Sequence, residues 1–107
     1  MAITNGIKLA EGSLTTKAIA VIRKSTDCSI AEIKNRVNNN EYVIEYESTD
    51  NKGLARILRL YHALQELGCE PQLFHRDILR PLSFFENMQD ARSDTARQLG
   101  IPEEDWF

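Results

Sequence analysis

The fold is decided by residues 42–68, which read YVIEYESTDNKGLARILRLYHALQELG. The first six alternate in polarity, which predicts a β-strand with Tyr42, Ile44 and Tyr46 on one side. Apolar residues between Leu54 and Leu67 then recur at steps of three and four, which predicts an amphipathic helix. A strand and a helix of this kind each bury one apolar side, so we expect them to share a core.

Cap and turn residues delimit this helix. Either Thr49 or Asp50 can cap its N-terminus, and Gly68 predicts a left-handed C-terminal cap. Residues 69–75 resume an extended pattern. Because Pro71 cannot donate to a β-ladder, we expect that strand to lie at an edge or to begin after the proline.

Two further helices are expected before the central strand. Ile7 to Leu9 alternate between glycines and predict a short edge strand. Ser13 can cap a helix that runs to about residue 25 and carries an apolar stripe. Ser29, followed three residues later by Glu32, forms a capping box that starts a second, short helix.

The fold class predicted from these elements is α+β. We expect a small antiparallel sheet in the order strand, helix, helix, strand, helix, strand, with the helices packed on one face. Residues 1–107 form a single domain, because a chain of this length leaves no room for a second one. Residues 1–75 form its core. Residues 76–107 form a helical extension, in which Pro81 begins one helix and a further helical stretch covers about 90–99.

Charge is distributed unevenly along the chain. Residues 1–40 carry six basic and three acidic groups. Residues 41–75 carry three basic and six acidic groups, and residues 76–107 carry four basic and seven acidic groups. The formal net charge is −3, which argues against a uniformly basic nucleic-acid binder but leaves room for a local basic face. The longest apolar run, from Ala18 to Ile22, is too short to span a membrane, so no membrane partner is expected. Two cysteines are too few for a disulfide framework, which favours a cytoplasmic location.

Catalytic and cofactor motifs are absent from the sequence. It has no phosphate-binding glycine loop, no GxSxG and no HExxH. Cys69 and His75 lack the paired spacing of a zinc site, and a nucleophile pair of Cys69 with His62 has no evident orienting group. We therefore expect no enzyme activity, no metal and no cofactor. The alternative is a hydrolase that uses Cys69 and His62. Hydrolysis of a substrate that is lost when either residue is changed would support it.

Residues 22–34 read IRKSTDCSIAEIK and carry a family resemblance, as does the turn at 64–70. Over residues 17–74 the chain resembles the C-terminal domain of the bacterial ribosomal stalk protein, which recruits translation GTPases. Identical residue types match that family's signature at Arg23, Thr26, Glu32 and Lys34. The resemblance implies the same small α+β fold. It also implies that Arg23 and Lys34 are partner contacts. The residues themselves predict a basic ridge over the first two helices, made by Lys17, Arg23, Lys24 and Lys34.

The chain departs from that family at the contact loop. Lys24, Asp27 and Ser29 stand where the family has glycines, and Ala31 stands where it has a lysine. These differences weaken the implied translation role. A module that binds translation GTPases or the ribosome through Arg23, Lys24 and Lys34 is therefore the second hypothesis.

The first hypothesis is a non-catalytic protein-binding module, in its most concrete form an immunity protein. Such a protein would occlude the basic active-site surface of a cognate toxin, most concretely a nuclease. Acidic residues in two segments, with a terminal aromatic anchor, are the expected contacts: Glu45, Glu47, Asp50, Glu103, Glu104, Asp105 and Trp106. An adaptor that delivers substrates to a protease is a further possibility. The predicted partner is thus a basic protein, with a translation GTPase as the alternative.

Overall fold

The computed structural model describes residues 3–98, excepting the side chains of residues 11 and 93–98. The elements in chain order are β1 (Thr4–Lys8), a 3-10 turn η1 (Glu11–Ser13), α1 (Thr16–Thr26), α2 (Ile30–Asn38), β2 (Ile44–Glu47), α3 (Asn51–Glu66), β3 (Gln72–His75), β4 (Ile78–Leu79) and α4 (Leu82–Gln98). The predicted α+β class is confirmed, with the expected order of strands and helices up to β3.

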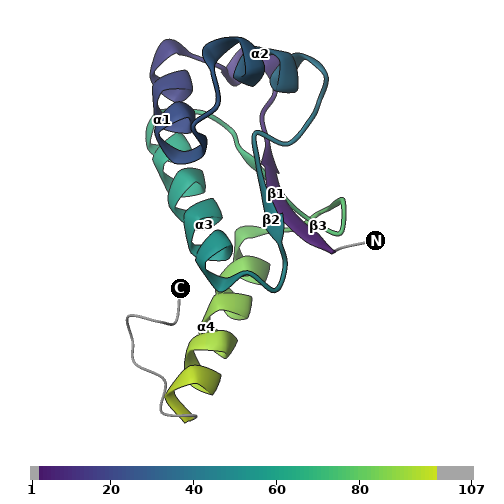
Figure 1. The fold of residues 1–107 in the computed structure, drawn as a ribbon, viewed down its shortest axis with the longest axis vertical. Coiled ribbons are helices and arrows are strands. Elements are labelled where there is room, and N and C mark those ends of the chain that lie inside the picture. Colours follow the sequence, from purple (N-terminus) through teal and green to yellow (C-terminus); the bar gives the residue numbers. More distant parts are fainter. Residues whose placement is uncertain (1–2, 99–107) are drawn as a thin grey trace.

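The four strands form one antiparallel sheet in the order β2-β1-β3-β4 (Figure 1). The first strand is therefore central, and the prediction of an edge strand is wrong. Its polar residues suggested exposure, but Asn5 is 1% exposed on the helix side and Ile7 is fully buried. A short alternating pattern fits an edge strand and a central strand equally well. In a central strand, the polar side chains can find partners within the fold.

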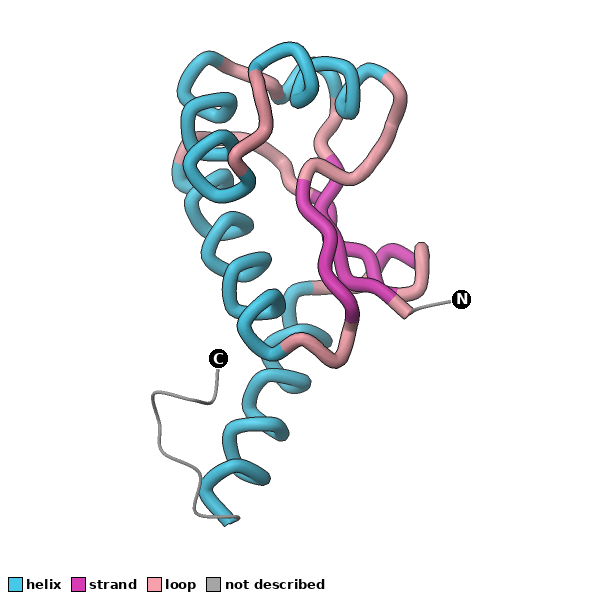
Figure 2. Tube along the Cα trace, in the orientation of Figure 1, coloured by secondary structure: helices cyan, strands magenta, loops and turns pink. Residues whose placement is uncertain are grey.

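Helices α1 and α3 lie side by side along one face of the sheet, as Figures 1 and 2 show. Between them and the sheet lies the core, whose fully buried members include Ile7, Ile22, Ile33, Val43, Leu54, Ile57, Leu60, Leu64 and Phe85. Among the described residues, no helix covers the opposite face of the sheet. That face is called the open face below.

Local capping chemistry sets the helix ends. Ser29 Oγ accepts from the Glu32 N–H at 3.1 Å, and an Asp50 carboxylate oxygen accepts from the Gly53 N–H at 2.8 Å, as predicted. Gly68 has φ +81°, also as predicted. The first helix begins later than expected, because Thr15 rather than Ser13 is its cap and accepts from the Ala18 N–H at 3.1 Å.

As far as the structure describes the C-terminal extension, to residue 98, it contains one helix, α4, rather than two. The ring of Phe85 is fully buried, so the first half of α4 belongs to the core. It is preceded by a hairpin between β3 and β4 that the sequence analysis missed. The two hairpin residues, Arg76 and Asp77, have φ values of 56° and 61°. This type of turn normally carries Asn-Gly or Asp-Gly, so Arg-Asp gives no sequence signal for it.

Candidate protein-binding surface on the open face of the sheet

A β-bulge at the start of β2 moves Tyr42 to the open face. Ile44 pairs with Ile7, and the Val43 N–H also donates to the Ile7 carbonyl at 2.9 Å, so two residues stand opposite one. Both Val43 and Ile44 are buried. The prediction that Tyr42 shares a side with Ile44 and Tyr46 is therefore wrong, because the bulge reverses the alternation at this point.

The ring of Tyr42 lies directly over the backbone of β1. A Cβ atom placed on Gly6 would come 2.5 Å from Tyr42 Cδ1 and 3.0 Å from the Ile44 carbonyl oxygen. Beside it, the ring of Phe74 from β3 makes an edge-on contact, with 5.8 Å between ring centroids and 76° between planes. Gly6 thus permits an aromatic pair to form across three strands, because no side chain lies beneath it.

Lys8 joins this aromatic pair from β1. Its Nζ lies 4.8 Å from the Tyr42 centroid and 4.9 Å from the Phe74 centroid, within the range of cation–π contact. The three side chains are each partly buried, and we call them the aromatic cluster. An ammonium group held over both rings occupies the surface on which a nucleic-acid base would stack.

The hairpin turn fixes the outer end of Tyr42. Its hydroxyl donates to a carboxylate oxygen of Asp77 at 2.5 Å. Burial raises the pKa of Tyr42 well above its usual value, and the hydrogen bond to Asp77 and the negative charges of Asp77 and Glu45 raise it further. Tyr42 is therefore a neutral hydrogen-bond donor on an acidic surface.

Acidic side chains lie near the aromatic cluster on the open face, where the hollow beside the cluster also contains Arg36. Glu45 and Glu47 alternate with inward-facing residues of β2, so both lie on the open face. Thr4 Oγ1 donates to Glu45 Oε2 at 2.7 Å, which holds that carboxylate across β1 and β2. Asp50 is the N-cap of α3, so its carboxylate is engaged in the fold. The predicted contacts Glu103, Glu104, Asp105 and Trp106 lie outside the described residues.

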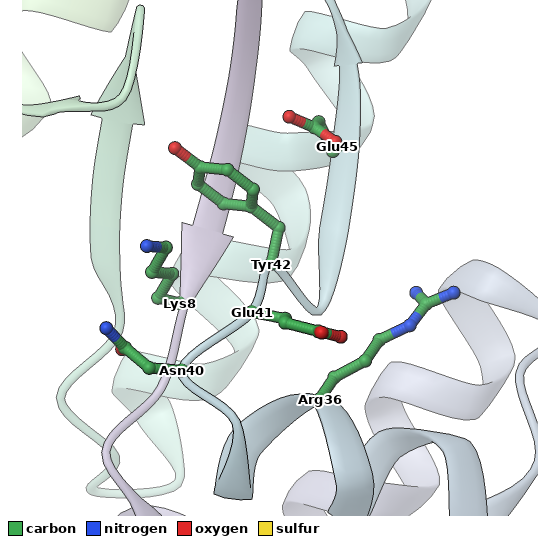
Figure 3. A pocket seen from close by; sticks show the side chains of 6 residues that line it. All are labelled: Lys8, Arg36, Asn40, Glu41, Tyr42 and Glu45. Carbon is green, nitrogen blue, oxygen red and sulfur yellow. The ribbon is translucent and has the colours of Figure 1, made fainter.

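A hollow of about 570 Å³ adjoins the cluster at the α2–β2 end of the sheet. Its lining side chains, shown in Figure 3, are Lys8, Arg36, Asn40, Glu41, Tyr42 and Glu45. Asn40 has φ 55°, which turns the chain from α2 into the strand. In Figure 3 Glu41 lies between Tyr42 and Arg36, so cations and carboxylates alternate around this hollow.

The predicted basic ridge is only partly assembled. Arg23 and Lys24 are exposed at the C-terminal end of α1 and line one hollow together. Lys34 is exposed on α2 and lines neither of the hollows next to them. Arg56 and Arg59 of α3 lie beside Lys24 instead. Sequence analysis missed these two arginines, because the helix that carries them is far from α1 in the chain.

Cys69 and His75 are held by contacts within the fold, whereas His62 is exposed. The Cys69 thiol is buried and donates to the Ser13 carbonyl at 3.2 Å, whereas His62 is exposed beside Tyr61. His75 Nδ1 lies 2.7 Å from the buried Asn5 Oδ1. Burial lowers the pKa of His75, and nearby arginines lower it further. Within the part of the chain that the structure describes, no three potential ligands gather to hold a metal ion.

No family model, curated protein or solved structure matches this chain. No helix among the described residues is long and apolar enough to cross a membrane. The function proposed below therefore rests on the fold and on the chemistry of the open face.

Proposed function

We propose that this protein is a non-catalytic binding module that docks a basic protein surface on the open face of its sheet. Its most concrete form is an immunity protein that neutralises a toxin, such as a nuclease, by covering its basic active-site surface. The observation that carries the proposal is the aromatic cluster of Lys8, Tyr42 and Phe74 on an uncovered sheet face with acidic side chains near it.

The chemistry of this face favours a protein partner over a nucleic acid. Partly exposed aromatic rings are the commonest anchors of protein interfaces, and rim carboxylates steer a basic partner toward them. The exposed carboxylates of Glu41, Glu45, Glu47 and Asp77 repel phosphate groups. Lys8 occupies the ring surfaces that bases would need.

The face is also preorganised for docking. Tyr42 is fixed by Gly6 beneath it, by Phe74 beside it and by Asp77 at its hydroxyl. Asp77 itself lies in a tight turn with φ 61°, a conformation that side chains other than Asn, Asp and Gly adopt at a cost. A rigid anchor loses little conformational entropy on binding, which increases affinity.

Co-expression tests the proposal directly. The chain is expressed with each secreted nuclease-toxin domain of its native organism, and colony survival and nuclease activity are measured. We expect one toxin to be neutralised, and the double variant Glu45→Lys/Glu47→Lys to lose this protection. Glu66→Lys/Glu86→Lys makes the same charge change at exposed sites on α3 and α4 and should retain it. Failure to protect against any of these toxins would contradict the immunity role.

A translation-associated module is the second candidate, and one observation favours it. Arg23 and Lys24, two of its three predicted contacts, line the same hollow. This candidate predicts that Arg23→Glu/Lys24→Glu abolishes binding to translation GTPases while Glu45→Lys/Glu47→Lys leaves it intact. The two double variants therefore separate the candidates.

A further inference from the structure

Two adjoining hollows lie at the C-terminal end of α1, and one of them is also lined by α3. One measures about 340 Å³ and is lined by Lys24, Ser25, Asp27, Arg56 and Arg59. The other measures about 440 Å³ and is lined by Ala20, Arg23, Lys24, Asp27 and Cys28. Because they share Lys24 and Asp27, they form one continuous surface, which we call the basic groove.

Four cations meet one carboxylate in the basic groove. Arg23 and Lys24 come from α1, Arg56 and Arg59 come from α3, and all four are exposed. Among the described residues, the charged ends of Lys24 and Arg59 form no hydrogen bond or ion pair. Arg56 donates to the neutral Tyr46 hydroxyl at 3.4 Å, and the negative charge of Asp50 also acts on it. The groove therefore carries excess positive charge that the fold does not neutralise.

The end of α1 accounts for only two of these cations, Arg23 and Lys24, which lie in its last turn. A helix C-terminus attracts positive charge when its last carbonyls are unpaired. Here Ser25 Oγ donates to the Val21 carbonyl at 3.1 Å and Thr26 Oγ1 donates to the Ile22 carbonyl at 2.8 Å. The Asp27 N–H donates to the Arg23 carbonyl at 2.9 Å. Of these acceptors only the Arg23 carbonyl belongs to the last four carbonyls of α1, so the helix end itself favours Arg23 and Lys24 in its last turn. Arg56 and Arg59 belong to α3, so the end of α1 does not explain them.

We propose that the basic groove is a second docking site, which binds an acidic peptide segment of a partner protein. Arginine side chains bind carboxylates through paired hydrogen bonds, and four cations along two joined hollows fit several carboxylates in succession. Asp27 lies in both hollows and accepts hydrogen bonds only, so a ligand that carries a donor fits it better than one that carries acceptors alone. The backbone N–H groups of a peptide supply that donor, whereas a polyphosphate chain offers acceptors alone.

The lining argues against a nucleic acid in this groove. It contains no aromatic side chain on which a base can stack. It also lies over the helix layer, whereas Glu45 and Glu47 lie on the open face. The proposal is therefore independent of the function proposed for the sheet, and either can fail alone.

Fluorescence anisotropy with a labelled decaglutamate peptide tests this site. At low ionic strength we expect saturable binding that weakens as salt is added. Lys24→Gln/Arg59→Gln should raise the dissociation constant by about tenfold, because it removes two charge-assisted contacts. Lys17→Gln/Lys34→Gln removes the same charge from exposed sites outside the groove and should change it by less than about twofold.

Three outcomes would overturn the proposal. The first is equal weakening by both double variants, which would mean that net charge alone attracts the peptide. The second is stronger binding of a decauridylate RNA or of inorganic polyphosphate at the same site. The third is no saturable binding of decaglutamate. Circular dichroism shows whether each variant is folded, and Glu45→Lys/Glu47→Lys should leave decaglutamate binding in the groove intact.

Discussion

Replacing Gly6 with alanine should displace the ring of Tyr42 and destabilise the protein. The added Cβ would lie 2.5 Å from Tyr42 Cδ1, whereas carbon atoms in favourable contact are about 3.5–4.0 Å apart. The ring must therefore move by about 1 Å or more. The new atom has little room to shift instead, because the Ile44 carbonyl oxygen is already 3.0 Å from it.

The magnitude of this effect has three parts. Overpacking of a fitted site costs about 1–3 kcal/mol. Loss of the Tyr42–Asp77 hydrogen bond, whose acceptor is charged, adds about 1.5–3 kcal/mol when the ring is fully displaced. Alanine in place of glycine within a strand returns about 0.5–1 kcal/mol. We expect a net loss of about 1–3 kcal/mol in the free energy of unfolding. The figure is lower than the full sum because a partial displacement of the ring costs less than a complete one.

Urea denaturation in two backgrounds measures this directly. In a Tyr42→Ala protein the ring is absent, so adding Gly6→Ala should cost less than about 0.5 kcal/mol. Gly12→Ala is the matched control, because nothing lies within 4 Å of its added Cβ. If Gly6→Ala costs the same with and without the Tyr42 ring, the reasoning about this contact is refuted.

Three more predictions concern stability. Gly53→Ala on α3 would bring a Cβ 2.5 Å from Tyr46 Cγ. Although alanine has the better helix propensity, we expect the free energy of unfolding to fall by about 1–2 kcal/mol in urea denaturation. A stabilised protein would contradict this. The lowered pKa of His75 favours its neutral form in the folded state, so the free energy of unfolding should fall as the pH decreases below about 6.5. His75→Gln should flatten that decrease between about pH 7.5 and 5.5, whereas an unchanged slope would exclude His75 as its source. Arg76→Gly should stabilise the protein by about 0.5–1 kcal/mol in thermal unfolding, because relief of about 1–2 kcal/mol of strain at φ 56° exceeds the entropy cost of about 0.5–1 kcal/mol that glycine adds. A lower melting temperature would argue against a strained turn.

Features set by neighbouring residues could be predicted from the sequence. Ser29 and Asp50 cap their helices and Gly68 has a positive φ, because each acts on backbone groups within a few residues. The shared face of Glu45 and Glu47 follows from strand alternation alone.

Features set by distant residues could not be predicted in this way. The side on which Tyr42 lies depends on a bulge opposite Ile7, a residue of another strand. The aromatic cluster therefore appears only when β1, β2 and β3 are paired. The basic groove depends likewise on α1 and α3 packing together, which brings Arg59 beside Lys24.

The central claim is that the open face binds a basic partner. Amide chemical-shift perturbation on the isotope-labelled chain, titrated with a decalysine peptide, tests it most directly. The claim predicts saturable shifts concentrated at Lys8, Tyr42, Glu45, Phe74 and Asp77, which Glu45→Lys/Glu47→Lys removes. Shifts concentrated on α1 and α3, or no saturable shifts at all, would contradict it.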